Sequence, residues 1–251
     1  MLANRVIPCL DIDEGRIVKG IRFQGLRDAG DPVECARAYE AQGADEIVLL
    51  DVSATPRGRA NNLAVVGEVR RVLSIPLTVG GGVRRAADAV RLLDAGADKV
   101  GVNTAAVERP ELITEMRERF GAQCTVVAVD AAAAARGGWE VVVRSGKVRT
   151  GLDAVEWCAK AVAHGAGEIL LTSWDRDGTG DGYDLDLIRE VTDAVNVPVV
   201  ASGGASGHDH MAQAISAGAS AALVASILHD DLTTVRLLKQ ALSADGIRIR
   251  P

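Results

Sequence analysis

The stretch QGADEIVLLD, residues 42–51, decides the fold because a second version of it, HGAGEILLTS, occupies residues 164–173. Two more stretches recur at the same separation of 122 positions. SIPLTVGGGV (74–83) pairs with NVPVVASGGA (196–205), and AGADKVGVNT (95–104) pairs with AGASAALVAS (217–226). Self-similarity at one fixed spacing indicates two copies of one structural unit. We therefore expect two repeated halves, at about 1–123 and 124–251, within a single domain spanning residues 1–251.

Eight short apolar runs, several of them inside these repeats, have the length of buried strands. Continuous apolar runs, in place of alternating ones, are typical of parallel strands covered on both faces. Helical periodicity separates the runs, and eight alternations of strand and helix predict an α/β protein with a (β/α)8 TIM barrel. The expected strands are Arg5–Leu10, Glu46–Val52, Leu77–Gly80, Lys99–Asn103, Thr125–Asp130, Glu168–Ser173, Val199–Ser202 and Ala221–Ala225.

Two segments interrupt this pattern, and each follows the carboxyl end of an expected strand. Residues 13–31, with glycines at 15, 20, 25 and 30, are predicted to form a long loop. Residues 139–151 (WEVVVRSGKVRTG) predict a small hairpin that turns at Ser145-Gly146. Barrel active sites lie at the carboxyl ends of the strands, so we expect the first segment to act as a lid.

The composition bounds the function. The 251 residues include 28 basic and 34 acidic ones, a net charge of −6, which argues against a nucleic-acid-binding surface. No run of 18 apolar residues and no cleavable leader is evident, so we expect neither a membrane span nor a signal peptide. Four cysteines without a C-x-x-C spacing suit reduced thiols, and we expect a cytoplasmic protein.

Asp11 and Asp130 each close an apolar strand at the start of a half. A strand end desolvates a carboxyl group and raises its pKa toward the range useful for proton transfer. Two carboxyl groups across one pocket can then divide the roles of acid and base. The alternative is that both aspartates cap neighbouring backbone amides. Their matched placement favours catalysis.

Glycine runs follow two of the expected strands, TVGGGV at 78–83 and ASGGAS at 201–206. Glycines let backbone amides approach a phosphate closely, and the next helix begins there with its positive dipole. Asn103-Thr104 and Ala225-Ser226 end the following strands and can complete two sites. A single run could be a simple tight turn, but a pair at these barrel positions predicts a substrate with a phosphate at each end.

Two segments raise the alternative of a metal site. TSWDRDGTGDGYD (172–184) contains a D-x-D-G that resembles the start of a calcium loop, but no glutamate stands at the twelfth position. We expect Asp177-Gly178-Thr179 to face the second phosphate. His208 and His210 begin a helix without an apparent third ligand, and we expect them to be exposed and metal-free.

Five motifs resemble one family nearly end to end. IPCLDIDEGRIVKG (7–20), TVGGGV (78–83), GADKVGVNTAAV (96–107), EILLTSWDRDGTGDGYD (168–184) and VVASGGA (199–205) are similar to the cyclase subunits of imidazole glycerol phosphate synthases. The combination of CLD with DRDGT is specific to that family within its superfamily, and its members are duplicated half-barrels. The resemblance implies a lyase of histidine biosynthesis. Ammonia from a partner glutaminase would convert phosphoribulosyl-formimino-aminoimidazole carboxamide ribonucleotide into imidazole glycerol phosphate and aminoimidazole carboxamide ribonucleotide.

The resemblance also implies roles for individual residues, with no cofactor. Asp11 and Asp130 would be the acid and base, and Lys19 would clamp the substrate. One phosphate would bind at Gly82, Asn103 and Thr104. The other would bind at Asp177, Gly178, Gly204, Ala205, Ala225 and Ser226, while Asp51, Thr172 and Ser202 would line the pocket.

The opposite barrel face carries a second part of the resemblance. Arg5, Glu46, Lys99 and Glu168 match the family's charged ring at the ammonia entrance. The alternative is a ring of salt bridges that only closes the barrel floor, and both roles can coexist. Asp98 would contact the glutaminase, which would dock on this amino-terminal face.

Two other functions remain open. The sister isomerase of the same pathway would use the same two aspartates in an Amadori rearrangement, without ammonia. The DRDGT loop and the charged floor favour the cyclase. A non-catalytic barrel that binds and activates a glutaminase is the alternative from a different class.

Overall fold

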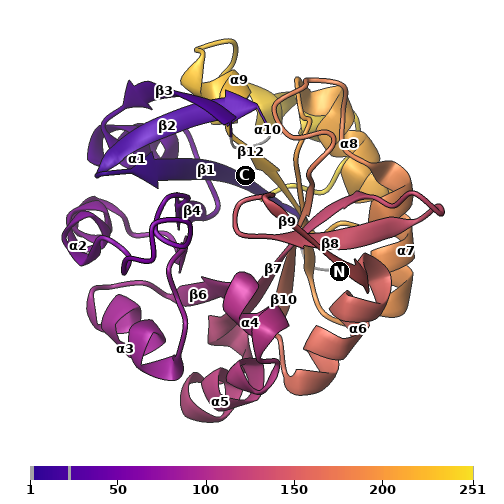
Figure 1. Ribbon diagram of the computed structural model, residues 1–251. Coiled ribbons are helices and arrows are strands. Elements are labelled where there is room, and N and C mark those ends of the chain that lie inside the picture. Colours follow the sequence, from indigo (N-terminus) through magenta and orange to yellow (C-terminus); the bar gives the residue numbers. More distant parts are fainter. Residues whose placement is uncertain (1–2, 22–23, 251) are drawn as a thin grey trace.

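A computed structural model describes residues 3–21 and 24–250. Eight parallel strands close into a barrel in the order β1-β4-β5-β6-β7-β10-β11-β12, and β12 pairs with β1 again. Figure 1 looks along this barrel, with the helices around it. The predicted (β/α)8 barrel is therefore confirmed. The strands are β1 (Arg5–Asp13), β4 (Ile47–Asp51), β5 (Leu77–Gly80), β6 (Lys99–Val102), β7 (Thr125–Ala133), β10 (Glu168–Ser173), β11 (Val199–Ser202) and β12 (Ala221–Val224).

The helices begin and end where capping residues indicate. The Asp31 carboxylate accepts from the amides of Val33 and Glu34 at the start of α1, and Gly165 ends α6 with φ of 109°. The helices are α1 (Pro32–Ala41), α2 (Leu63–Val72), α3 (Ala86–Asp94), α4 (Thr104–Glu108), α5 (Glu111–Phe120), α6 (Ala154–His164), α7 (Leu185–Ala194), α8 (His208–Ser216), α9 (Ser226–His229) and α10 (Val235–Ala244), with a 3-10 turn at Ala122–Cys124.

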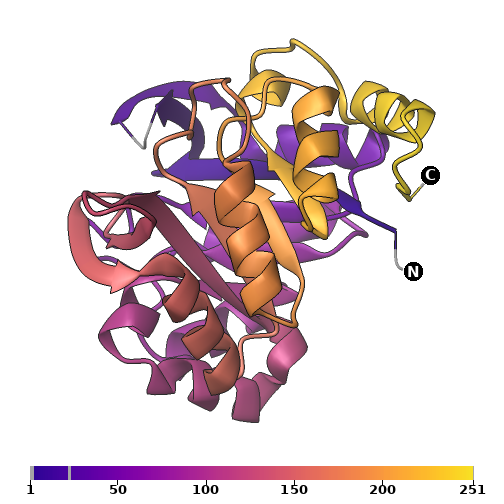
Figure 2. The ribbon, with the colours of Figure 1, turned by 90° about the vertical axis from the view of Figure 1, so that its right-hand side faces the viewer.

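Two antiparallel hairpins extend from barrel strands. The expected loop at 13–31 is wrong in its local structure, because β2 (Arg16–Ile21) pairs with the end of β1 and β3 (Gln24–Gly30) pairs with β2. The hairpin expected at 139–151 is confirmed as β8 (Trp139–Val143) and β9 (Val148–Asp153), with β8 paired to β7. Figure 2 shows the barrel from the side: both hairpins lie at one end of it, and the first and last described residues of the chain lie toward the opposite end.

Alternation along the strands assigns side chains to two layers. Val6, Leu10 and Ile12 of β1 belong to the large apolar cluster between barrel and helices. Ile7 and Cys9 belong to a small cluster inside the barrel, with Val48, Val126, Leu170, Val200, Ala221 and Leu223. This inner plug separates the barrel floor, at the strand amino ends, from the mouth at their carboxyl ends. The inward positions of β1 thus continue from the plug to Asp11 at the mouth.

No helix among the described residues is long and apolar enough to cross a membrane. The repeated segments form β4 and β10, β5 and β11, and β6 and β12. The division into halves at about 1–123 and 124–251 stays a prediction from the sequence repeat.

Candidate active site

A cavity of about 540 Å³ opens at the mouth of the barrel. Every side chain and glycine that the sequence assigned to catalysis or to substrate binding lines it. These are Asp11, Lys19, Asp51, Gly82, Asn103, Thr104, Asp130, Thr172, Asp177, Gly178, Ser202, Gly204, Ala205, Ala225 and Ser226.

Asp130 occupies an inward position near the end of β7 and is 8% exposed. The Asn103 side-chain amide donates to its Oδ2 over 2.9 Å. Burial, and after it the nearby charge of Asp177, raise the pKa of Asp130 to about 7, while the Asn103 hydrogen bond acts in the opposite direction. Asp130 therefore retains a proton near neutral pH, where an ordinary aspartate would have lost it.

Asp11 lies on β1 at the same mouth and is also 8% exposed. Burial raises its pKa, whereas the positive charge of Lys19 lowers it and Asp177 raises it. The Cys9 thiol donates to Asp11 Oδ1 over 3.4 Å, which favours the ionised carboxylate. Asp11 thus has a cation beside it, while Asp130 has a neutral amide, so the two carboxyl groups differ in environment.

Lys19 reaches this site from β2, a strand and not the flexible loop that the sequence suggested. Its side chain is 9% exposed, and its Nζ lies 3.8 Å from Asp177 Oδ1. Burial lowers the pKa of Lys19, but the charges of Asp11 and Asp177 outweigh it and hold the pKa above its ordinary value. The ammonium is therefore charged, and its single positive charge attracts the carboxyl groups of Asp11 and Asp177.

The first predicted phosphate site is already hydrogen-bonded within the protein. The Gly82 amide donates to the Thr55 hydroxyl over 3.2 Å. The Arg144 amide, at the tip of the β8–β9 hairpin, donates to the Thr104 hydroxyl over 3.0 Å. An anion arriving here would compete with both bonds. Neither Thr55 nor Arg144 could be predicted as a site residue, because both contact the site from loops that are distant in sequence.

The hairpin tip is fixed across the mouth by contacts to other loops. The Ser145 hydroxyl donates to the Val52 carbonyl over 3.0 Å. Arg144 Nη2 pairs with Glu108 over 2.9 Å, and Arg144 and Ser145 both have positive φ, at 56° and 58°. Such backbone values are uncommon outside glycine and cost energy, so the contacts must stabilise this turn.

The glycine runs are needed first for close backbone packing. A Cβ at Gly81 would lie 2.2 Å from the Asp51 carbonyl oxygen, and one at Gly203 would lie 2.7 Å from the Ser173 carbonyl oxygen. Both glycines have positive φ, at 93° and 94°. Each run thus folds against the end of the preceding barrel strand, which leaves Gly82 and Gly204 at the cavity wall.

Asp51 has a structural partner that the sequence did not indicate. Arg59 approaches its carboxylate with two nitrogens, at 2.6 Å and 2.8 Å, and the Ala54 amide donates to it over 3.0 Å. Asp51 is 1% exposed. This bidentate pair anchors the loop between β4 and α2 at the cavity wall.

The four predicted floor residues form a closed ring of alternating charge. Lys99 Nζ lies 2.9 Å from Glu46 and 2.8 Å from Glu168. Arg5 Nη1 lies 2.8 Å from Glu46, and Arg5 Nη2 contacts Glu168. Burial opposes ionisation of Glu168, but the two cations hold its pKa below the ordinary value. The ring closes the end of the barrel opposite to the cavity.

Asp98 lies near this ring, at the start of β6, with half of its side chain exposed. Its Oδ2 accepts from the Leu77 amide over 2.8 Å and pairs with Arg70 over 2.9 Å. Asp98 therefore helps to fix the floor, and its role in partner binding stays a prediction.

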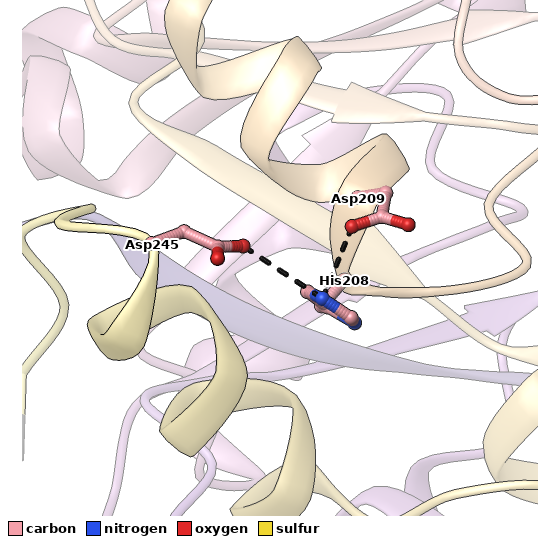
Figure 3. A group of neighbouring side chains, drawn as sticks. All are labelled: His208, Asp209 and Asp245. Atoms are coloured by element: carbon pink, nitrogen blue, oxygen red, sulfur yellow. Dashed lines mark ion pairs between the residues drawn. The ribbon is translucent and has the colours of Figure 1, made fainter.

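The two histidines at the start of α8 diverge. His210 Nδ1 accepts from the Ser206 amide over 3.3 Å. His208 Nε2 lies 3.0 Å from Asp209 and 3.7 Å from Asp245, and their ligand atoms are all within 4.8 Å (Figure 3). Asp245, at the end of α10, thus joins His208 and Asp209, whereas His210 is not a member of this group. Asp209 and Asp245 are exposed, and His208 is partly buried.

Comparisons with known proteins add to this geometry. The profile of the histidine biosynthesis protein family matches residues 5–234. The chain belongs to this family. It is 54% identical to the imidazole glycerol phosphate synthase subunit HisF of Mycobacterium tuberculosis (strain ATCC 25177 / H37Ra), over 99% of this chain and 96% of the relative. The family resemblance drawn from the sequence motifs is confirmed, and the relative is named as a subunit of imidazole glycerol phosphate synthase.

Proposed function

We propose that this chain is the cyclase subunit of an imidazole glycerol phosphate synthase, a lyase of histidine biosynthesis. One observation carries the proposal: Asp11 and Asp130 line one cavity between two glycine-rich rims, in a chain that is 54% identical to a HisF subunit. The substrate is the phosphoribulosyl-formimino-aminoimidazole carboxamide ribonucleotide, with one phosphate at each rim. Ammonia converts it into imidazole glycerol phosphate and aminoimidazole carboxamide ribonucleotide, and the oxygen of the ribulosyl carbonyl leaves as one water.

The two aspartates take different roles. An ammonia nucleophile loses protons as it adds, and the departing nitrogen of the aminoimidazole product needs a proton. Asp11, beside Lys19, is the carboxylate base. Asp130, whose pKa of about 7 keeps a proton available, is the acid. This division follows from the charged neighbour that one carboxyl has and the other lacks.

The phosphates fix the substrate between these groups. One binds at Gly82, Asn103 and Thr104, and displaces the Thr55 and Arg144 contacts. The other binds at the opposite rim, and Lys19 orients the substrate between the two. Holding both ends places the reacting atoms beside the carboxyl groups and removes the entropy cost of aligning them. The second rim comprises Asp177, Gly178, Gly204, Ala205, Ala225 and Ser226.

Ammonia is supplied by a partner glutaminase that docks on the amino-terminal face, where Asp98 is half exposed. The closed ring of Arg5, Glu46, Lys99 and Glu168 then acts as a gate, and one of its ion pairs must open for ammonia to pass. The inner apolar plug favours neutral ammonia over ammonium. All four cysteines are free thiols, in keeping with action in the reducing cytoplasm.

The test assays the purified chain with the ribonucleotide and excess ammonium salt at alkaline pH. Both products should form without the partner. Asp11→Asn should abolish turnover and leave substrate affinity within a few-fold, since a general base contributes about 10²- to 10⁴-fold or more to rate. Asp186→Asn is the control, because Asp186 is exposed on α7, outside the cavity, and pairs with Arg189 over 2.7 Å.

Three results would contradict the proposal. Isomerisation of the ribosyl precursor without use of ammonia would make the chain the sister isomerase. Substrate binding without products would make it a non-catalytic activator of a glutaminase. Full turnover by Asp11→Asn would remove the assignment of the base.

A further inference from the structure

His229 stands between the second phosphate rim and the catalytic strand. It ends the short helix α9, which begins at Ser226. Its backbone amide donates to the Ala225 carbonyl over 3.0 Å. Its imidazole Nε2 lies 3.0 Å from the Cys9 carbonyl oxygen on β1. A single residue therefore connects the rim segment Ala225-Ser226 with the strand that carries Asp11.

This contact occurs where the barrel ladder changes partners. β1 pairs with β12 from Arg5 to Pro8, and the last pair is Pro8 with Val224. From Cys9 onward, β1 pairs with β4 on its other side. Cys9 is the residue after Pro8, where the pairing of β1 with β12 ends. Its carbonyl oxygen accepts a hydrogen bond from the imidazole of His229, which takes the place of a neighbouring strand. The bond thus supports β1 two residues before Asp11.

A second residue orients the imidazole. Tyr39, buried on α1, places its hydroxyl 2.7 Å from His229 Nδ1, and the two rings lie 5.9 Å apart between centroids. A carbonyl only accepts, so Nε2 carries the proton and donates to Cys9, while Nδ1 accepts from the Tyr39 hydroxyl. Burial lowers the pKa of His229 to about 4, so the ring stays neutral in this one tautomer.

The position of Asp11 depends further on Cys9 itself. The Cys9 thiol donates to Asp11 Oδ1 over 3.4 Å. A shift of the Cys9 backbone would therefore move both the strand and one hydrogen-bond donor of the carboxylate. Displacement of a reacting group by about 1 Å can lower a rate by about 10²-fold.

We propose that His229 is a positioning residue, which holds the Asp11 end of β1 in register with the Ala225-Ser226 rim through its bond to the Cys9 carbonyl. The inference rests on the proposed role of Asp11 as base. It predicts that loss of the Nε2 donor reduces kcat. KM should stay nearly unchanged, because His229 is not one of the residues that line the substrate cavity.

Two amide substitutions that differ by one methylene test this directly. His229→Gln can place its amide nitrogen near the position of Nε2 and reach Cys9. His229→Asn can accept from Tyr39 but is too short to reach Cys9. We expect His229→Asn to lose about 10- to 100-fold in kcat with KM within about threefold, and His229→Gln to recover kcat to within about fivefold of the wild type.

Tyr39→Phe is the matched control. It removes a buried hydrogen bond to the same ring and leaves the bond to Cys9. We expect its Tm to fall while kcat stays within about threefold of the wild type. If His229 had a purely structural role, kcat would instead fall in proportion to the loss of Tm in all three variants.

The proposal is overturned if His229→Asn keeps kcat within threefold, if its loss lies in KM, or if Tyr39→Phe loses as much kcat as His229→Asn. Nitrogen-15 NMR of the wild-type imidazole gives a reading that needs no variant to fold: a proton on Nδ1 in place of Nε2 would also overturn it. Failure of the proposed function can be distinguished from failure of this inference, because in the first case the wild type itself would form no product from ammonia.

Discussion

Replacement of Asp130 by asparagine is expected to stabilise the protein at pH 8 while it removes catalysis. The pKa of Asp130 is about 7 in the folded protein, against an ordinary value near 4 in an unfolded chain. At a pH between these two pKa values, Asp130 has released its proton in the unfolded chain but still holds it in the folded protein. Stability therefore falls as pH rises from about 4 to about 7.

The magnitude follows from the two pKa values. Each pKa unit corresponds to about 1.4 kcal/mol, so the buried carboxylate costs about 4 kcal/mol of folding free energy above pH 7. An amide has the same shape and can still accept from Asn103, but it carries no charge to desolvate. We expect Asp130→Asn to recover about 2 to 4 kcal/mol at pH 8, which raises Tm by several degrees in a chain of this size.

Urea unfolding of the wild type and the variant at pH 5 and pH 8 measures this. The stability difference should be about threefold larger at pH 8 than at pH 5, because the unfolded aspartate is already mostly ionised at pH 5. Asp51→Asn is the control from the same cavity, because its bidentate bond to Arg59 should make that change destabilising by about 2 kcal/mol. Equal effects of Asp130→Asn at both pH values, or destabilisation at pH 8, would show that the Asp130 carboxylate is not destabilising in the folded protein.

Two more predictions concern the charges of the site and the floor. Asn103→Leu removes the amide donor to Asp130, a hydrogen bond worth about 1.5 to 3 kcal/mol, and should raise the pKa of that carboxyl by about 1 to 2 units. Carbon-13 NMR titration of the Asp130 carboxyl measures this pKa, and an unchanged or lowered value would contradict the prediction. Glu168→Gln should destabilise the protein by about 3 kcal/mol at pH 7, since it leaves Arg5 short of a partner. Because the pKa of Glu168 is lowered in the folded protein, its contribution to stability is present above about pH 4.5 and is lost as the pH falls further. The difference in unfolding free energy between the wild type and Glu168→Gln should therefore shrink in acid. A constant difference down to pH 3 would contradict this prediction.

The barrel was predictable because strands that are buried on both faces are continuous apolar runs in the sequence. Strands such as β5 and β11 are continuous apolar runs, and they were expected with the bounds that the structure has. The β2–β3 hairpin was missed because glycines at 15, 20, 25 and 30 and several polar residues gave it the composition of a loop. Its strands are stabilised by pairing with β1, a tertiary contact that local composition does not report.

The site was predictable where chemistry and strand position coincide. Asp11 and Asp130 follow apolar strands and point to the mouth, as alternation requires. Contacts between loops far apart in sequence were not predictable. The Arg144 amide reaches Thr104 from 40 residues away, and His229 reaches Cys9 from 220 residues away. Such pairs depend on how the closed barrel brings its rim segments together.

A crystal structure of the chain with the bis-phosphate ribonucleotide, or with a non-reacting analogue of it, tests the central claim most directly. We predict one phosphate on the Gly82 and Thr104 side, the other on the Gly204 and Ser226 side, and the middle of the ligand between the carboxyl groups of Asp11 and Asp130. A ligand held by one rim alone, or with its reactive centre out of reach of both carboxyl groups, would contradict it.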